Sequence, residues 1–280
     1  MLRCGSRHGD GHQAIHQLIS RSIDLAYDPQ TYWESAHARD DLSSVGQIGY
    51  SAAWNRWLYR AWLTTGLRFL REQHVTARSV CDVGAGRGSW FPVWRAIGAQ
   101  HITATDRSQV AVDRLGGDRN HLLDIARKGS AASMGEFDLV AAMYVLLHVT
   151  DEAGFDAARD NLASLVRRDG YLLVADPIVL GSRESLSIEG APSRARRLDD
   201  YEFPGLARVG IGAATVIGSD PVERHGWWEW PERVRWGVTA RLGSQLPWLL
   251  GPIIATVDPW LARRTSLMPS AKLVLYQRVR

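Results

Sequence analysis

The spacing of apolar residues predicts that strands and helices alternate through the middle of the chain. Short apolar runs with the length of buried strands cover 79–83, 101–106, 120–124, 137–142 and 171–175. Helical patterns, with apolar residues at every third or fourth position, cover 89–97, 108–115 and 151–168. Strands that alternate with helices in this way form a doubly wound, mostly parallel sheet. We therefore expect an α/β fold with helices on both faces of the sheet.

Two helical patterns precede this centre. The first covers 13–27 and is expected to end at Asp28-Pro29, because the residue before a proline is pushed out of the helical region. The second covers 50–72 and gathers its apolar residues along one side. We expect residues 1–77 to form an N-terminal helical cap on a domain that begins at residue 78.

The strongest single feature is the junction of the first strand and its helix, Val80-Cys81-Asp82-Val83-Gly84-Ala85-Gly86-Arg87-Gly88. Glycines at every second position let the backbone turn tightly and approach a ligand without a Cβ in the way. Ser89 is the expected N-cap of the following helix. The spacing differs from the Gly-x-Gly-x-x-Gly of dinucleotide-binding loops, and no P-loop Lys-Ser or Lys-Thr follows. The junction therefore predicts a cofactor cradle of another kind.

The junction resembles the first motif of class I S-adenosylmethionine (SAM) dependent methyltransferases, in which an acidic residue precedes Gly-x-Gly-x-Gly. Asp82 fills that acidic position. Asp106 ends the second strand about 20 residues after the glycine loop, where an acidic residue binds ribose hydroxyls. The run Phe137–His148 resembles the fourth motif of the family. Together the three matches make residues 78–177 similar to the small-molecule members of this family.

The resemblance implies which residues bind SAM. Asp124 and Ile125 would lie beside the adenine, and Met143 and Tyr144 would lie at the end of a strand next to the cofactor. Arg39 follows a Tyr-Trp segment typical of the family and would pair with the methionyl carboxylate, or it is a surface arginine beside packed aromatics. The full expected set is Arg39, Asp82, Gly84, Ala85, Gly86, Gly88, Asp106, Arg107, Asp124, Ile125, Met143 and Tyr144.

Two residues near the ends of later strands are candidates for proton transfer. His148 is the candidate catalytic base, because its ring titrates near neutral pH; the alternative is a histidine that only hydrogen-bonds the backbone near the cofactor. Asp176, before Pro177, is either a second acid or base or simply a turn residue. A phenolate, carboxylate or amine acceptor needs little such help, whereas a hydroxyl acceptor needs a base.

In the family the last two strands form an antiparallel hairpin that completes a seven-stranded, Rossmann-like sheet. Here those strands are expected at 213–217 and 272–279. The segment 181–204 before them is expected to be a solvated loop, because its arginines, Arg196 among them, are balanced by nearby acids.

Tryptophan is concentrated outside the predicted cofactor core. All 12 tryptophans lie either between Trp33 and Trp94 or in an extension over residues 220–270. We expect this extension and the N-terminal segment to cover the site and to favour an apolar or aromatic acceptor; a second core or a homodimer face is the alternative. Leu246–Ile254 is apolar enough to touch a membrane surface, but its prolines and glycine argue against a long interfacial helix.

Composition narrows the possible functions. The formal net charge of +3 is too small to argue for nucleic acid as a partner. Cys4 and Cys81 support neither a disulfide framework nor a zinc site, and the glycines around His8 and His12 argue against a helical metal site. Neither a secretory signal nor a run of about 20 apolar residues is present, so we expect a cytoplasmic protein without a transmembrane helix.

These observations lead us to expect that residues 78–280 bind SAM and methylate a small, hydrophobic or aromatic acceptor on oxygen or nitrogen, as in secondary metabolism. A methyltransferase that acts on a peptide, a protein or RNA is an alternative, as is a non-catalytic SAM-binding module. Ala142-Met143-Tyr144-Val145 stands where relatives that modify macromolecules carry an Asn-Pro-Pro-Tyr-like segment, which argues against RNA. The glycine spacing argues against an NAD-linked oxidoreductase.

Overall fold

The computed structural model describes residues 27–39, 42, 46–47, 50–180, 186–187, 193–217, 238–239, 241–264 and 271–279. The helix expected over 13–27 and the tryptophans from 227 to 236 lie outside these residues. The strands are β1 (Ser79–Val83), β2 (His101–Asp106), β3 (Arg119–Leu122), β4 (Phe137–Met143), β5 (Val166–Val179), β6 (Leu186–Ser187), β7 (Arg194–Arg197), β8 (Leu206–Ala213) and β9 (Ala271–Arg278). The helices are α2 (Pro29–Ala38), α3 (Ala52–Glu72), α4 (Phe91–Ala96), α5 (Gln109–Arg114), α6 (Glu152–Leu165) and α8 (Pro247–Arg264), with short 3-10 helices η1 (Leu146–His148) and η2 (Leu198–Asp200).

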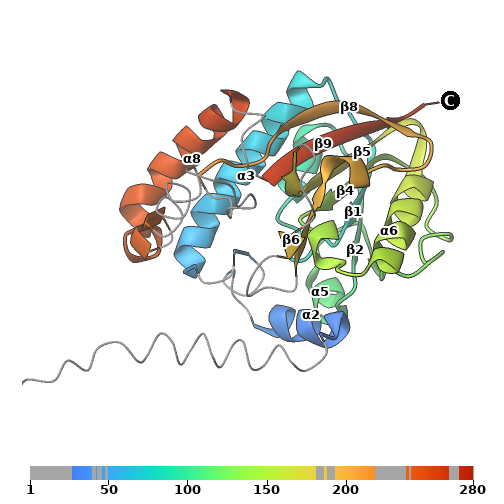
Figure 1. Ribbon diagram of the computed structural model, residues 1–280, viewed down its shortest axis with the longest axis horizontal. Helices are drawn as coiled ribbons and strands as arrows, with labels where there is room; N and C mark the ends of the chain where they lie inside the picture. The colour runs from blue at the N-terminus through green and yellow to red at the C-terminus, as the bar shows by residue number, and fades with distance from the viewer. Residues whose placement is uncertain are drawn as a thin grey trace, which may run out of the picture.

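The central sheet has the strand order β3-β2-β1-β4-β5-β9-β8 (Figure 1). The first five of these strands are parallel, β9 runs antiparallel to β5, and β8 runs antiparallel to β9. The far end of β5 also pairs with β7, which in turn pairs with β6. The expected Rossmann-like sheet of seven strands, closed by an antiparallel hairpin, is therefore confirmed.

Helices cover both faces of the sheet, as the alternation of strands and helices predicts. On one face α3 and α4 pack through Trp54, Leu58 and Trp94 against the strands. On the other face α6 packs through Phe155 and Leu162. Figure 1 shows α3 beside α8 on one side of the molecule and α6 on the opposite side. Because both faces are covered, β1 and β4 are buried on both sides, which accounts for their largely apolar sequences, whereas β3 at the edge of the sheet is polar and mostly exposed.

Several boundaries differ from the sequence-based expectation. Asp28-Pro29 begins a helix that the sequence did not predict: the Asp28 side chain accepts hydrogen bonds from the backbone N–H groups of Gln30 and Thr31, and Pro29 occupies the first turn of α2. Ser89 does not cap α4, which begins at Phe91 after Trp90 and has no side-chain cap.

The later part of the chain also needs correction. The strand expected at 213–217 is β8 at Leu206–Ala213, and the residues after it turn away to bind the carboxylate of Asp258 on α8. The segment 181–204 contains β6, β7 and η2, and Arg196 is buried rather than solvated. The region with prolines and a glycine does form a long helix, since α8 carries Pro252 and Pro259 inside it.

Three points raised by the composition concern the described residues: the cysteine, membrane-spanning helices and metal ligands. Cys81 is a free, fully buried thiol in β1, as expected of a small apolar core residue. None of the described helices combines the length and hydropathy needed to cross a membrane. Within the same described residues, no group of three His, Cys, Asp or Glu side chains is arranged to hold a metal ion.

Candidate functional site

The parallel strands bring the predicted site residues to one edge of the sheet. The glycine loop follows β1, Asp106 ends β2, Tyr144 follows β4, and Asp176 lies in the second half of β5. The carboxyl ends of parallel strands share one edge, where ligands bind in open α/β sheets. The fold therefore brings the predicted motifs together.

The glycine loop has the left-handed backbone that its sequence predicts. Gly84, Gly86 and Gly88 have φ angles of 66°, 58° and 70°. A Cβ on Gly84 would lie 2.5 Å from Cγ2 of Val145, so this glycine is required both by its backbone angle and by the close approach of the β4 loop. The Ala85 N–H donates to the Thr105 carbonyl at 2.8 Å, which ties the loop to β2.

Asp106 connects the glycine loop with the start of α5. Its two carboxylate oxygens accept hydrogen bonds from the backbone N–H groups of Gly86 and Ser108, each at 2.9 Å. Ser108 caps α5 as expected, since its Oγ accepts from the Ala111 N–H. Burial raises the pKa of Asp106, and these hydrogen bonds and the neighbouring His37 oppose that rise. A carboxylate offers about four lone-pair positions, so the two oxygens retain capacity for a ligand.

Asp82 is held beneath the loop rather than exposed at its rim. It is fully buried in β1, and its Oδ2 accepts a hydrogen bond of 2.8 Å from the indole Nε1 of Trp94 on α4. Burial raises the pKa of Asp82 to about 7, and the indole hydrogen bond partly counteracts that rise. Asp82 thus fixes the position of α4 against the strand that carries the glycine loop.

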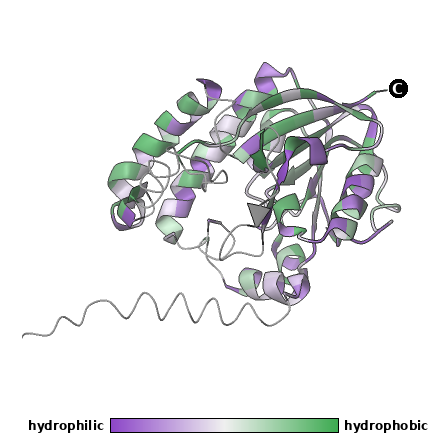
Figure 2. Ribbon diagram, viewed as in Figure 1, coloured by the Kyte–Doolittle hydropathy of each residue, from purple (hydrophilic) through white to green (hydrophobic). Residues whose placement is uncertain are grey.

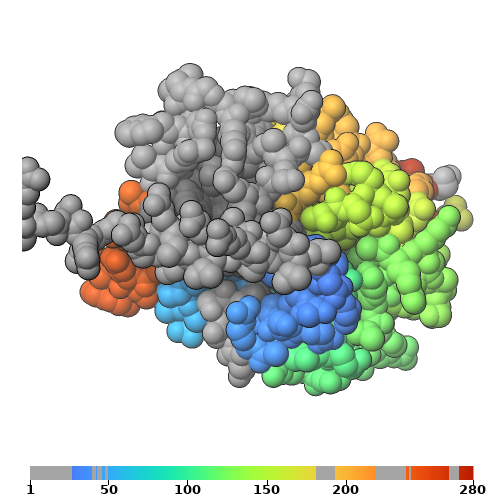
Figure 3. All heavy atoms as spheres, turned by 60° about the horizontal axis from the view of Figure 1, so that its bottom comes forward, coloured from blue at the N-terminus to red at the C-terminus, as the bar shows by residue number. Residues whose placement is uncertain are grey.

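Helix α2, which the sequence analysis missed, docks on this edge. Glu34 accepts hydrogen bonds from the Ser108 hydroxyl and from the backbone N–H groups of Gln109 and Val110, at 2.7 to 3.2 Å. A carboxylate at this position stabilises the first turn of α5. Figure 3 shows the dark blue surface of α2 lying directly against the green surface that includes α5.

His37 on α2 is a site residue that the sequence reasoning did not find. It is buried, and its Nε2 lies 4.0 Å from Oδ1 of Asp106. Burial lowers the pKa of His37, the carboxylate of Asp106 opposes this, and the cations Arg87 and Arg114 add to the lowering. The signal was available, because an Asp-Pro dipeptide followed by helix-forming residues marks a helix start.

The expected carboxylate partner Arg39 is exposed at the C-terminal end of α2. Arg87, inside the glycine loop, is a second cation at this edge, because its charge lowers the pKa values of both His37 and Tyr59. In the sequence, Arg87 occupies a position between two glycines of the motif and has no predicted role of its own.

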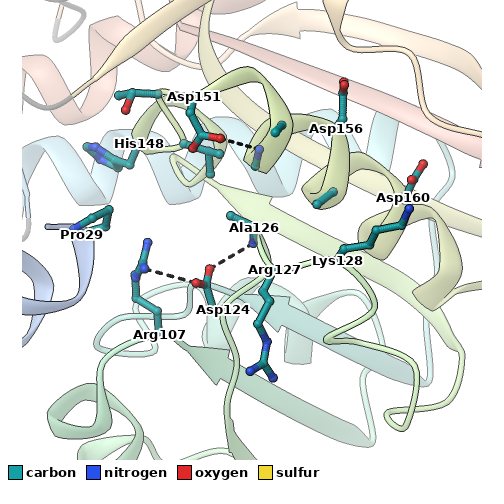
Figure 4. A pocket seen from close by; sticks show the side chains of 15 residues that line it. Pro29, Arg107, Asp124, Ala126, Arg127, Lys128, His148, Asp151, Asp156 and Asp160 are labelled. Carbon is teal, nitrogen blue, oxygen red and sulfur yellow. Dashed lines mark hydrogen bonds and ion pairs between the residues drawn. The ribbon is translucent and has the colours of Figure 1, made fainter. Parts of the chain in front are cut away.

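A cavity of about 760 Å³ is lined by Arg107, the residue that follows Asp106 in the sequence (Figure 4). Asp124 and Arg107 lie on one side of it and His148 and Asp151 on the other. The Arg107 guanidinium donates to Oδ2 of Asp124 at 3.3 Å, while the Ala126 N–H donates to Oδ1 at 3.1 Å. Ile125, next to Asp124 in the sequence, is buried and does not line the cavity. The cavity thus brings together the residues expected around an adenine ring and the candidate base.

Contacts with Ser193 and Trp33 help to hold His148 in the wall of this cavity. Its Nδ1 lies 3.1 Å from the hydroxyl of Ser193, and the Trp33 ring packs edge-on against it with centroids 4.7 Å apart. The 3-10 helix that carries His148 is supported from behind by Arg196, whose guanidinium donates to the Val149 carbonyl at 2.7 Å and lies 3.9 Å over the Phe155 ring.

Asp176 belongs to this buried support and is not a turn residue. It is fully buried within β5, and its Oδ2 accepts a hydrogen bond of 3.2 Å from the Tyr201 hydroxyl. Burial raises the pKa of Asp176 to about 8, so the carboxyl is largely protonated at neutral pH.

Aromatic side chains from α3 face the end of β4. The Tyr144 and Trp62 rings lie 5.0 Å apart, and Trp62 and Tyr59 are also 5.0 Å apart. Tyr144 has a φ of 59°, unusual for a residue with a side chain, and its N–H donates to the Ala175 carbonyl at 2.6 Å. Met143 is buried next to it. The cluster Tyr59, Trp62 and Tyr144, which we call the aromatic wall, packs tilted rings against one another, with Trp62 buried and Tyr59 and Tyr144 partly exposed.

Comparison with known proteins agrees with this geometry. The model of a family described as a methyltransferase domain matches residues 54–225. A ubiquinone biosynthesis O-methyltransferase of Aromatoleum aromaticum is 36% identical over 112 residues, which is 36% of this chain and 45% of that protein, so the match spans less than half of the relative.

Two solved structures share the fold at low sequence identity. The N-methyltransferase NodS from Bradyrhizobium japonicum, solved with S-adenosyl-L-homocysteine, is 14% identical, with a TM-score of 0.50 over 90% of this chain and all of NodS. The Haloferax volcanii complex of the Trm112 methyltransferase activator with a putative methyltransferase gives 13% identity and a TM-score of 0.53, over 90% of this chain and 98% of that one. Since the family model covers more than half of the sequence, the chain belongs to the methyltransferase domain family, with the fold and motifs of the class I SAM-dependent enzymes.

Proposed function

We propose that this protein transfers the methyl group of SAM to a small acceptor of apolar or aromatic character. The observation that carries the proposal is Asp106: it ends β2, holds Gly86 of the glycine loop and keeps acceptor capacity towards the site. The named activities of the relatives, O-methylation in one and N-methylation in the other, support an oxygen or a nitrogen as the methylated atom.

The residues at this edge fit SAM part by part. Asp106 would accept hydrogen bonds from the ribose hydroxyls, with His37 above it. Asp124 would hold the adenine in the cavity that it lines, next to the buried Ile125. The methionyl carboxylate has two candidate partners, Arg87 in the glycine loop and Arg39 at the end of α2.

When bound, SAM supplies a methyl group already activated on a sulfonium sulfur. The chain therefore has to align the lone pair of the acceptor with that methyl group and to exclude water. The aromatic wall would orient a flat or apolar acceptor, because aromatic faces stack on such groups and exclude water from them.

His148 would serve as a base for acceptors that must lose a proton. Its contact with Ser193 permits this in one tautomer only: if Nδ1–H donates to the Ser193 oxygen, Nε2 carries the lone pair that accepts the proton. Substitution by glutamine should then slow methylation of hydroxyl acceptors far more than methylation of amines, which arrive with their own lone pair.

Calorimetry with SAM and S-adenosylhomocysteine tests the cofactor assignment, with NAD as the negative control. Asp106→Asn should weaken binding by about 10- to 100-fold, the value of one or two charged hydrogen bonds. Asp113→Asn, on the exposed side of α5, is the matched control and should bind like the wild type. Failure of the wild type to bind either ligand, or equal binding by Asp106→Asn, would refute the assignment.

The acceptor can then be sought among hydrophobic phenols, carboxylic acids and amines by following S-adenosylhomocysteine formation. Trp62→Ala, which removes the middle ring of the aromatic wall, should raise KM for the acceptor and leave the affinity for SAM unchanged. If Trp62→Ala weakened only SAM binding, the aromatic wall would contact the cofactor rather than the acceptor.

A further inference from the structure

Helix α8 exposes a continuous apolar stripe on the outside of the molecule. Leu249, Ile253, Val257 and Trp260 are spaced by four, four and three residues, so they share one side of the helix. Their exposed fractions are 48%, 52%, 37% and 52%, and that of Trp248 at the start of the helix is 70%. Figure 2 shows α8 as a largely green, hydrophobic helix along the outer margin, with α3 between it and the sheet.

The orientation of this stripe is fixed by the opposite side of the helix. Gly251 packs so closely on Trp57 of α3 that a Cβ would lie 2.1 Å from its ring, and Ile254 is buried beside it. Asp258 is fully buried and accepts hydrogen bonds from the Thr215 hydroxyl at 2.7 Å and from backbone N–H groups after β8. Because α8 is anchored in this way, its apolar stripe cannot turn inward without breaking a buried carboxylate site.

The exposed charged side chains of the segment 241–264 have a single sign. They are all arginines, namely Arg241, Arg263 and Arg264, and Nε of Arg263 lies 3.2 Å from Oε1 of Glu72 on α3. The one acid in this segment, Asp258, is buried. The Arg264 guanidinium lies 4.4 Å over the Trp260 ring, which joins a cation to the end of the apolar stripe.

We propose that α8 lies in the plane of a lipid membrane that carries anionic headgroups. Tryptophans at both ends, aliphatic side chains between them and exposed arginines are the features of an interfacial helix. The apolar stripe would enter the acyl boundary, while Arg264 and Arg241 would meet the lipid phosphates. This surface is separate from the cofactor site, so the proposal does not depend on the proposed acceptor.

A second copy of the chain is the competing occupant, and the charge pattern disfavours it. In a two-fold dimer each surface meets itself, so one copy of α8 would face another. All exposed charges on this segment are positive, so arginines would approach arginines without an acid on the same segment to balance them. An anionic surface would supply a counter-charge for Arg241 and Arg264.

Co-sedimentation with vesicles tests the proposal on the full chain. The wild type should pellet with phosphatidylcholine vesicles that contain phosphatidylglycerol, and less with phosphatidylcholine alone or in high salt. Ile253→Glu should lower the partition at least about tenfold, and Arg264→Gln about fivefold on anionic vesicles only. Val209→Glu places the same charge on a residue of β8 that is 45% exposed, and it should partition like the wild type.

SAM calorimetry and the molecular mass in solution separate the outcomes. Each variant should bind SAM like the wild type, which shows that a lost partition does not come from unfolding. The proposal is overturned if the folded wild type ignores anionic vesicles or if Val209→Glu loses as much partition as Ile253→Glu. A wild-type dimer that Ile253→Glu splits into monomers would also overturn it, because a second copy would then cover the stripe.

Discussion

Replacing Gly84 by alanine separates two physical demands on the glycine loop. An alanine at a φ of 66° costs about 1–2 kcal/mol for the left-handed backbone. Its Cβ would also lie 2.5 Å from Cγ2 of Val145, and overpacking of this kind costs about 1–3 kcal/mol. The expected loss in the free energy of unfolding is therefore about 2–5 kcal/mol, with weaker SAM binding because Val145 and the loop must move apart.

Gly129→Ala is the matched control for this experiment. Gly129 has a φ of 71° but no atom within 4 Å of an added Cβ, so only the backbone cost of about 1–2 kcal/mol applies. Urea unfolding of both variants gives the contact cost as the difference between them, and calorimetry gives their affinity for SAM. If Gly84→Ala loses no more stability than Gly129→Ala, the close approach of Val145 is not what requires a glycine at this position.

Three further predictions follow from other contacts at the site. Folding raises the pKa of Asp176 from 3.8 to about 8, so the carboxyl stabilises the folded state below pH 3.8 and this contribution is lost as the pH rises towards 8. Relative to the wild type, the free energy of unfolding of Asp176→Asn should therefore rise by about 1 kcal/mol per pH unit across this range. If urea unfolding gives both proteins the same pH dependence, this prediction is wrong. Arg87→Ala should weaken SAM binding more than Arg39→Ala in calorimetry if the loop arginine holds the methionyl carboxylate, and the reverse order would assign that role to Arg39. Glu34→Gln should increase proteolysis and hydrogen exchange in α2 but not in the sheet, because it weakens the hydrogen bonds that hold α2 on α5. Unchanged hydrogen exchange in α2 would show that other contacts hold it.

The centre of the fold could be predicted because its local signals agree with its tertiary environment. The strands β1 and β4 are buried on both faces, so their apolar runs are clear in the sequence, and Ser108 and Asp151 cap helices where their residue types predict. The glycine loop and Asp106 could be placed at one edge because parallel strands leave no other arrangement.

The errors occur where tertiary contacts override the local pattern. The sequence around Arg196 predicts a charged loop, but the structure has β7 and η2 there. The Arg196 guanidinium is buried because it donates to a backbone carbonyl and stacks on the Phe155 ring. The prolines in α8 are tolerated in a helix that α3 and the buried Asp258 hold in place. Hydrogen bonds of this kind join residues that are distant in the sequence, and no spacing rule reports them.

Helix α2 links the two halves of the candidate site. Trp33 and His37 are one helical turn apart, so they share one side of α2; Trp33 packs on the candidate base His148, while His37 approaches Asp106. Glu34, between them in sequence, holds the helix on the first turn of α5. A displacement of α2 would therefore move His37 away from Asp106, the proposed ribose ligand, and remove the Trp33 contact from the ring of His148 at the same time. If cofactor binding orders α2, it would also orient the candidate base His148. One helix would then couple cofactor binding to the positioning of the base.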